Sequence, residues 1–286
     1  MRSVLISVEE LASHLDDPAW IVCDCRHDLA DTGAGRRAYA ESHIPGARFV
    51  HLDEDLSAPK TGRNGRHPLP DVAAFAKRLG ELGIDGTKQV VAYDASGGPY
   101  AARLWWMLRW LGHDAVRVLD GGWPAWTKAG KPVTGDLPRP QPVRFVPQLQ
   151  ADAARSADAV GAGLRKQSGK RSPLLLDARA PNRYRGENET LDPVAGHIPG
   201  AANRFFQMNL DPEGKFKPAD VLKKELGAAL GGHGPEQVIH YCGSGVTACH
   251  NLLAMEIAGL SGSRLYPGSW SEWCADPARA VERGAQ

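Results

Sequence analysis

Cys242 is the residue whose surroundings most clearly predict chemistry. It precedes the segment Gly243-Ser244-Gly245-Val246-Thr247. A glycine-rich segment of this kind can wrap around a sulfur atom and turn successive backbone N–H groups toward it, which makes an anion-binding nest. A helix that begins there adds the positive end of its dipole. Both effects favour the thiolate, the nucleophilic form of cysteine, although a small buried cysteine is the ordinary alternative.

The elements around Cys242 indicate how it is positioned. Residues 238–241 form a short β-branched run that predicts a strand, and the apolar spacing of residues 248–258 suits a buried helix. The same order of strand, turn and helix begins at residue 90, where Asp94 follows the strand. Alternation of strands and helices predicts an α/β fold with a mostly parallel sheet flanked by helices. Ligands of such sheets bind at the carboxyl ends of strands, where Asp94 and Cys242 stand.

Four landmarks recur in one order and indicate two copies of one domain. They are an apolar run ending in Asp (21–24 and 174–177), His-Ile-Pro-Gly-Ala (43–47 and 197–201), a strand ending in Tyr (90–93 and 238–241) and a Trp-x-x-Trp segment (123–126 and 270–273). The first copy has Asp94 where the second has Cys242. We therefore expect one working site and one scaffold copy.

A proline-rich segment marks the joint between the copies. Residues 137–147 contain four prolines, which favour an extended connector, and a strap packed along one domain is equally compatible. We expect a non-catalytic domain over residues 1–136, a linker over 137–147 and a catalytic domain over 148–286.

Composition excludes several classes of function. The 286 residues carry 34 Lys and Arg against 33 Asp and Glu, a formal charge of +1. Global electrostatics therefore give no argument for nucleic-acid or membrane binding. No apolar run approaches the roughly 20 residues of a membrane helix, and the early acidic Glu9 and Glu10 do not suit a signal peptide. Five cysteines, an odd number, suggest reduced thiols and a cytoplasmic location.

The cysteine loop, the doubled His-Ile-Pro-Gly-Ala and the terminal Gly268-Ser269-Trp270-Ser271-Glu272-Trp273 resemble the tandem-domain rhodaneses. Within that family the chain looks most like the members that use 3-mercaptopyruvate. The resemblance covers nearly the whole chain. It implies two rhodanese domains, of which the C-terminal one is catalytic, and sulfur transfer through a persulfide on Cys242.

The residues after Cys242 separate the related chemistries. Cysteine phosphatases carry an arginine at the sixth position after the cysteine, where this chain has Ala248. Thiosulfate-preferring rhodaneses usually place Arg and Lys directly after the cysteine, where this chain has Gly243 and Ser244. A neutral loop better fits a donor whose carboxylate is held elsewhere and whose carbonyl needs a hydrogen bond, as in 3-mercaptopyruvate.

The resemblance also implies an arginine for the donor. In related enzymes the residue matching Arg183 binds the carboxylate or sulfonate, and the guanidinium fork can hold two oxygens at once. A surface ion pair with Glu187 or Glu189 is the ordinary alternative. Many mercaptopyruvate enzymes carry another arginine where this chain has Asp192, and Arg185 is the candidate to replace it.

Three further residues match family positions proposed to form a triad. In that scheme Asp53 orients His67, and His67 assists Ser244 in moving a proton. We expect these positions to line the active-site cleft, although His67 could simply hydrogen-bond at a domain interface. The charged turn segment 60–66 could guide an anion inward, and a solvated loop explains it equally well.

Other reactive side chains are expected to be structural. Arg179 has a counterpart, Arg26, in the copy without a nucleophile, and His43 and His197 recur in the same way. Cys249 is either a resolving thiol or, by default, a buried helical cysteine.

We therefore expect a sulfurtransferase that moves the sulfur of 3-mercaptopyruvate through Cys242 and releases pyruvate. Loop N–H groups would contact the donor, together with Ser244; the loop residues concerned are Gly243, Gly245, Val246 and Thr247. The acceptor would be thioredoxin, a low-molecular-weight thiol or cyanide, and no metal or organic cofactor is needed. The alternatives are a thiosulfate sulfurtransferase and a non-catalytic rhodanese-fold binding module or sulfur carrier.

Overall fold

The computed structural model describes residues 3–164 and 172–285. The chain divides into two compact units. The first contains residues up to Ala58, Pro70–Gln150 and Pro212–Lys215, and the second contains Pro59–Leu69, Ala151–Asp211 and the residues from Phe216 onward. Among the described residues, none of the helices combines the length and the apolar character needed to cross a membrane.

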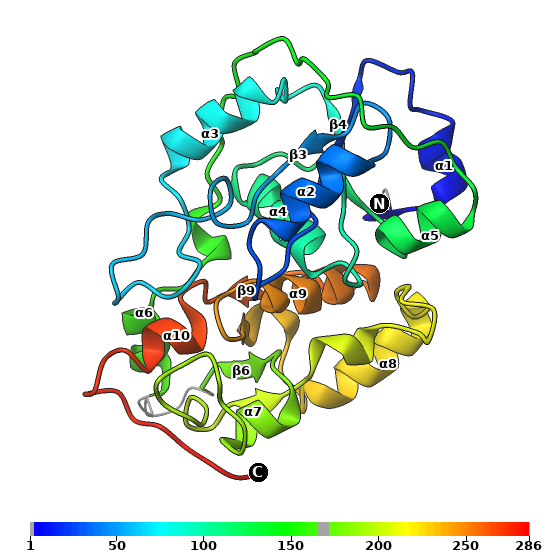
Figure 1. Cartoon of the computed structure of the whole chain (residues 1–286). Coiled ribbons are helices and arrows are strands. Elements are labelled where there is room, and N and C mark those ends of the chain that lie inside the picture. Colours follow the sequence, from blue (N-terminus) through cyan, green and yellow to red (C-terminus); the bar gives the residue numbers. More distant parts are fainter. Residues whose placement is uncertain (1–2, 165–171, 286) are drawn as a thin grey trace. The chain divides into compact units, whose positions relative to one another are not determined.

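The first unit is built on a five-stranded parallel sheet (Figure 1). Its strands have the order β1-β5-β4-β2-β3. The elements are β1 (Leu5–Ile6), α1 (Val8–Ala12), β2 (Trp20–Asp24), α2 (Ala34–Glu41), β3 (Arg48–Phe49), α3 (Val72–Glu81), β4 (Gln89–Tyr93), α4 (Pro99–Trp110), β5 (Val116–Leu119) and α5 (Gly122–Lys128). This confirms the α/β class expected from alternating strands and helices.

The second unit repeats this plan with four parallel strands in the order β7-β6-β8-β9. A parallel bridge from Ala154 to Leu265 stands where the first unit has β1. The elements are η1 (Ala151–Ala153), α6 (Ala157–Leu164), β6 (Leu174–Asp177), α7 (Pro181–Arg185), β7 (Ala202–Asn203), η2 (Phe206–Asn209), α8 (Ala219–Ala229), η3 (Pro235–Gln237), β8 (Val238–Tyr241), α9 (Thr247–Ile257), β9 (Arg264–Leu265) and α10 (Ser269–Trp273).

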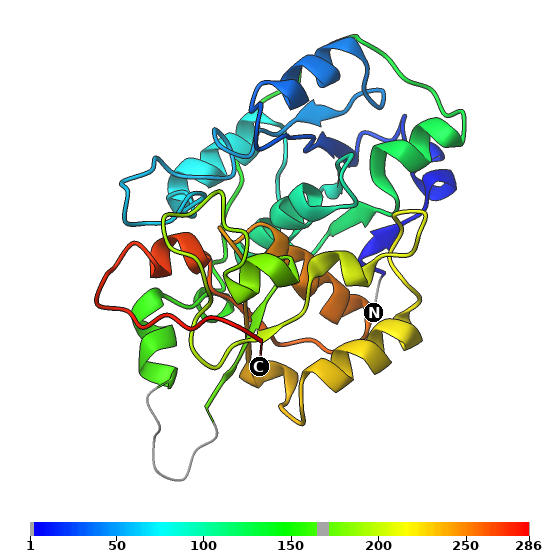
Figure 2. The same cartoon turned by 60° about the horizontal axis from the view of Figure 1, so that its bottom comes forward.

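Helices cover both faces of the second sheet. Alternate residues of a strand point to opposite faces, so Ile239 and Tyr241 share one face and His240 lies on the other. Ile239 and Tyr241 pack with residues of α6, α7 and α10 in one buried core. The other side is covered by α9, which packs on β8 and lies beside α8 (Figures 1 and 2). The strand end that precedes Cys242 is thus held from both sides.

Recurring residues of the two copies form matching structural contacts. Arg26 pairs with the buried Asp24, and Arg179 pairs with the buried Asp177, both at 2.7 Å. The Arg26 guanidinium also stacks on Trp123, and that of Arg179 stacks on Trp270. His43 and His197 hydrogen-bond through Nδ1 to a backbone carbonyl oxygen at 2.7 and 2.8 Å. These contacts agree with the structural roles expected from recurrence.

The proline-rich segment runs along the first unit. The backbone N–H of Val143 donates to the carbonyl of Gly80, and those of Gln148 and Gln150 donate to Leu111 and Trp110 at the end of α4. A side chain at residue 80 would lie 2.3 Å from the Val143 oxygen, so glycine permits this close approach. The segment is therefore a strap on the first unit, which was the second possibility raised by its prolines.

Candidate active site

Cys242 lies directly after β8, at the carboxyl end of the second sheet, and is buried. Its Sγ accepts the backbone N–H groups of Ser244 at 3.4 Å and Gly245 at 3.1 Å. The helix α9 begins at Thr247, and the N–H groups of a first helical turn have no partner within their own helix. The loop therefore surrounds the sulfur with positive dipole ends that stabilise negative charge on it.

The start of α10 holds the cysteine loop in place. The N–H groups of Trp270 and Ser271 donate to the carbonyls of Cys242 and Gly243. The Cys242 N–H donates to Ser269 Oγ at 3.1 Å. Ser269 has a positive φ of 54°, which is strained for a residue with a side chain, and its two hydroxyl hydrogen bonds hold it there.

Gly245 is required by the tight fit of the loop. Its φ is +77°, and a Cβ there would lie 2.3 Å from the carbonyl oxygen of Pro267. A larger residue would force the loop away from this carbonyl and withdraw the N–H group that reaches Sγ. Ser244 and Gly245 thus contact the sulfur directly. Contacts of Gly243, Val246 and Thr247 with a donor stay a prediction.

His67 and Ser244 form a buried pair. Their Nδ1 and Oγ atoms are 2.7 Å apart. The loop 59–69 that carries His67 belongs to the second unit, although it lies within the first copy of the sequence repeat. Asp53 belongs to the first unit, where its carboxylate lies 3.8 Å from His27 Nε2. The pairing of Asp53 with His67 stays a prediction.

Arg183 lies beside the loop within an acidic cluster. Its guanidinium pairs with Glu189 at 2.8 Å and Asp192 at 3.4 Å. The Arg183 nitrogens would be 3.6 and 3.7 Å from a Cβ placed on Gly243. The Arg183–Glu189 pair weighed at sequence level is therefore present, and so is the approach to the loop. The arginine charge holds the pKa of Glu189 below its ordinary value despite burial, which raises it.

Arg185 makes a different contact. It pairs with Glu187 at 2.6 Å, and the Arg185 and Glu187 side chains are 34% and 54% exposed. A substrate-binding role for Arg185 stays a prediction.

Arg66 is a site residue that the sequence did not single out. A Cβ on Gly243 would lie 2.6 Å from its Nη2, and its Nη1 pairs with Asp192. The available signals were its position next to His67 and the basic character of residues 60–66. Two arginines therefore flank the residue after Cys242.

The other cysteines have different surroundings. None of the five cysteines forms a disulfide, and all five are buried. Burial raises the pKa of Cys23 to about 12 and that of Cys274 to about 11. The thiol of Cys249 donates to the Gly245 carbonyl at 3.3 Å, which suits a loop-supporting contact. Burial thus disfavours the thiolate at Cys23 and Cys274, whereas the thiol of Cys249 supports the loop.

Two other features of the first unit bring polar side chains together. His27, His51 and Asp53 bring ligand-type atoms within 4.8 Å of one another. Both ring nitrogens of His51 are committed, because Nδ1 accepts backbone N–H groups and Nε2 faces the Thr32 oxygen at 2.9 Å. This cluster is therefore not arranged to hold a metal ion.

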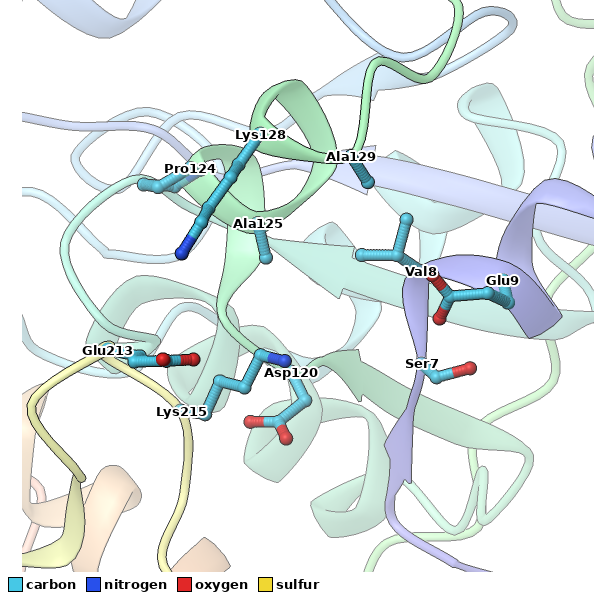
Figure 3. Close-up of a pocket in the computed structure, with 10 residues that line it drawn as sticks. All are labelled: Ser7, Val8, Glu9, Asp120, Pro124, Ala125, Lys128, Ala129, Glu213 and Lys215. Atoms are coloured by element: carbon cyan, nitrogen blue, oxygen red, sulfur yellow. The ribbon is translucent and has the colours of Figure 1, made fainter.

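A pocket of about 270 Å³ lies beside α1 and α5 in the first unit (Figure 3). It is lined by Ser7, Val8, Glu9, Asp120, Pro124, Ala125, Lys128, Ala129, Glu213 and Lys215. Its charges are of both signs, and its one hydroxyl, of Ser7, caps α1 by accepting the Glu10 N–H at 3.1 Å. The pocket therefore offers no nucleophile of the kind found at Cys242.

Comparisons with known proteins place the chain in a family. The family described as "Rhodanese-like domain" matches residues 7–129 and 161–276. The "Probable 3-mercaptopyruvate sulfurtransferase" of Pseudomonas aeruginosa is 49% identical over 98% of both chains. The thiosulfate sulfurtransferase of Bos taurus is 36% identical over 93% of this chain and 90% of its own.

Solved structures agree with this assignment. The crystal structure of SseA from Escherichia coli, presented among 3-mercaptopyruvate sulfotransferases, is 30% identical, with a TM-score of 0.80 over 94% of this chain and 99% of that one. Both halves of the chain match the same domain, and the Pseudomonas relative is similar along nearly its whole length. The protein therefore belongs to the family built from two tandem rhodanese-like domains.

Proposed function

We propose that this protein is a 3-mercaptopyruvate sulfurtransferase. The observation that carries the proposal is the environment of the Cys242 sulfur. Two backbone N–H groups donate to it, and Arg66 and Arg183 lie beside the adjacent Gly243. A carboxylate-bearing sulfur donor needs these two features side by side. The identity of 49% to a relative of that name, over the whole chain, supports the same donor.

The first half-reaction follows from the groups around Cys242. Arg183 binds the donor carboxylate, and the Cys242 thiolate attacks the donor sulfur. The S–S bond forms as the sulfur–carbon bond breaks, and its electron pair passes to the enolate of pyruvate. The enolate takes up a proton on carbon, and pyruvate leaves. Cys242 then carries the outer sulfur as a persulfide.

Two sets of groups assist this step. Loop N–H groups and the Ser244 hydroxyl stabilise the developing enolate, because preorganised donors are most effective where charge appears. The His67–Ser244 pair can supply the proton, since it is hydrogen-bonded and buried. In the full triad, Asp53 would orient His67.

The second half-reaction returns the enzyme to its starting state. The thiolate of an acceptor, or cyanide, attacks the outer sulfur of the persulfide, and the electron pair of the S–S bond returns to Cys242. The products are an acceptor persulfide or thiocyanate. Thioredoxin and low-molecular-weight thiols are the acceptors that we expect, in the cytoplasm, where cysteines outside disulfides stay reduced.

Thiosulfate is the rival donor, and the arginine pair is the observation that favours it. A dianion would profit from two guanidinium groups. However, the buried carboxylates of Glu189 and Asp192 offset both charges, which favours a monoanion such as 3-mercaptopyruvate. The ratio of kcat/KM for the two donors decides between them, and a preference for thiosulfate would overturn the proposed donor.

Intact-mass spectrometry tests the covalent step. Incubation with 3-mercaptopyruvate is expected to add the mass of one sulfur atom, and cyanide is expected to remove it. Cys242→Ser must abolish both the added mass and turnover. Cys249→Ser, which changes a cysteine of the helix α9 that follows the loop, is the matched control and is expected to keep them. Unchanged turnover in Cys242→Ser would reject Cys242 as the nucleophile, whereas a wild type that shows neither turnover nor added mass would favour the binding module.

A further inference from the structure

Arg66 is held rigidly beside the cysteine loop by backbone contacts. Its N–H donates to Ser271 Oγ at 3.0 Å, in α10. The preceding Gly65 has a φ of +83°, and a Cβ there would lie 2.8 Å from the carbonyl oxygen of Gly268. The chain around residue 66 therefore packs closely against the same helix start that anchors the loop of Cys242.

The Arg66 guanidinium reaches the same point as Arg183. A Cβ on Gly243 would lie 2.6 Å from Arg66 Nη2 and 3.6 Å from Arg183 Nη2. Since Gly243 directly follows Cys242, both guanidinium groups lie next to the backbone that carries the nucleophile. Glycine at residue 243 leaves the space between loop and arginines open.

Asp192 connects the two arginines. Its carboxylate pairs with Arg66 through one oxygen and with Arg183 at 3.4 Å through the other. The Asp192 side chain is 2% exposed, whereas those of Arg66 and Arg183 are 25% and 20% exposed. The carboxylate is therefore more deeply buried than the two arginines, whose side chains are partly open to a second anion.

We propose that Arg66 is the second arginine that binds the carboxylate of the sulfur donor, with Arg183 as its partner. The inference rests on the proposed function of the same site. It also explains how the chain can carry an aspartate at position 192, because the loop before His67 supplies the second guanidinium. Arg66, Arg183, Asp192 and Gly243 all belong to the second unit.

A pair of alkylating reagents tests this role without any sulfur donor. Iodoacetate carries a carboxylate, and iodoacetamide is its neutral isostere, so the ratio of their rates at Cys242 reports anion binding beside the thiolate. Arg66→Gln is expected to lower the iodoacetate rate about tenfold or more, in line with loss of a charged hydrogen-bonded pair. The iodoacetamide rate is expected to stay within about twofold, which would show an intact loop and nucleophile.

Three further variants separate binding from structure. Arg183→Gln is expected to lower the ratio as Arg66→Gln does. Arg63→Gln removes an exposed charge from the same segment and is expected to leave the ratio unchanged. Asp192→Asn breaks the ion pair but keeps both arginines, so it is expected to keep the iodoacetate preference. An equal loss in Asp192→Asn and Arg66→Gln would instead assign Arg66 to holding its loop, and would overturn the proposal.

Donor kinetics then distinguish this inference from the proposed function. Arg66→Gln is expected to raise KM for 3-mercaptopyruvate about tenfold while sulfur loading at saturating donor persists. An unchanged KM and an unchanged alkylation ratio would refute the role of Arg66 and leave the sulfurtransferase intact. A wild-type preference for thiosulfate would refute the proposed donor, whereas the alkylation ratio would still measure the anion site.

Discussion

The loop after β4 and the loop after β8 have corresponding backbone hydrogen bonds, but the first surrounds a carboxylate and the second a sulfur atom. The N–H of Trp123 donates to the Asp94 carbonyl as that of Trp270 does to the Cys242 carbonyl, at 2.8 and 3.0 Å. The Asp94 carboxylate accepts four backbone N–H groups, from Ser96, Gly98, Tyr100 and Ala101, at 2.8–3.0 Å. Cys242 Sγ accepts two.

The difference teaches what the cysteine loop can hold. Carboxylate oxygens lie one bond beyond the atom attached to Cβ, and the outer sulfur of a persulfide lies one bond beyond Sγ. The first loop therefore surrounds a side-chain anion that extends as many bonds from Cβ as a persulfide would. By position, Val246 and Ala248 match Gly98 and Tyr100. We infer that their N–H groups stabilise the outer sulfur during the catalytic cycle.

The largest expected effect comes from copying the first loop into the second. Cys242→Asp removes the nucleophile, so turnover is expected to fall roughly a thousandfold or more. The carboxylate would accept the N–H groups of the loop, so stability is expected to be retained or raised. Turnover assays and urea denaturation measure the two effects, with Cys242→Ser as the variant that loses the nucleophile without adding a carboxylate. A clear loss of stability in Cys242→Asp relative to Cys242→Ser would show that the two cradles are not equivalent.

A smaller effect is expected from neutralising Asp94 in the loop after β4. In the wild type, backbone N–H groups donate to both carboxylate oxygens of Asp94. In Asp94→Asn, some of them would face the NH2 group of the amide, and the unfolding free energy is expected to fall by about 2–4 kcal/mol. Burial raises the pKa of Asp94, whereas the hydrogen bonds from the four N–H groups lower it. The substitution removes this hydrogen-bonded carboxylate, and its effect therefore falls on the folded state. Urea denaturation measures the change. Asp120→Asn, at the end of the neighbouring strand β5, serves as the control. A change below about 0.5 kcal/mol would mean that the loop does not depend on its anion.

A third effect, which appears only at acid pH, concerns the strands beneath the two loops. By register, His240 of β8 stands where β4 has Ala92, and both are fully buried. Burial lowers the pKa of His240 from 6.5 to about 3. As pH falls from about 6.5 to about 3, the unfolded chain takes up a proton that the folded chain refuses. Stability is therefore expected to fall by up to about 1.4 kcal/mol per pH unit over this range.

A variant isolates this titration from the carboxyl groups. His240→Leu keeps the buried volume and removes the imidazole, so its stability is expected to decline less steeply below pH 6.5 than that of the wild type. Hydrogen exchange of β8 amides in both proteins measures the difference, with β4 amides as the internal control. Equal pH slopes at β8 would mean that His240 takes up its proton as readily in the folded protein as in the unfolded chain.

Much of the frame could be read from residue order. Strand and helix alternation follows from local apolar spacing, and repeated landmarks reveal a second copy whatever the tertiary contacts are. Cys242 could be placed because a loop between strand and helix is a local feature, and sulfur at a strand end faces the ligand side of a parallel sheet. The contrast between Cys242 and Asp94 needed nothing beyond aligned copies.

The tertiary structure alone decided which charges meet at the nucleophile. Arg66 and Asp192 are 126 positions apart, and their ion pair exists because residues 59–69 pack against the second unit. Spacing along the chain carries no information about such a contact. Asp192, which the sequence presented as a lost arginine, proved to connect two others. The chain order thus determined the nucleophile and its cradle, which are local, whereas packing between distant segments determined the anion site, because side chains far apart in sequence meet only in the folded chain.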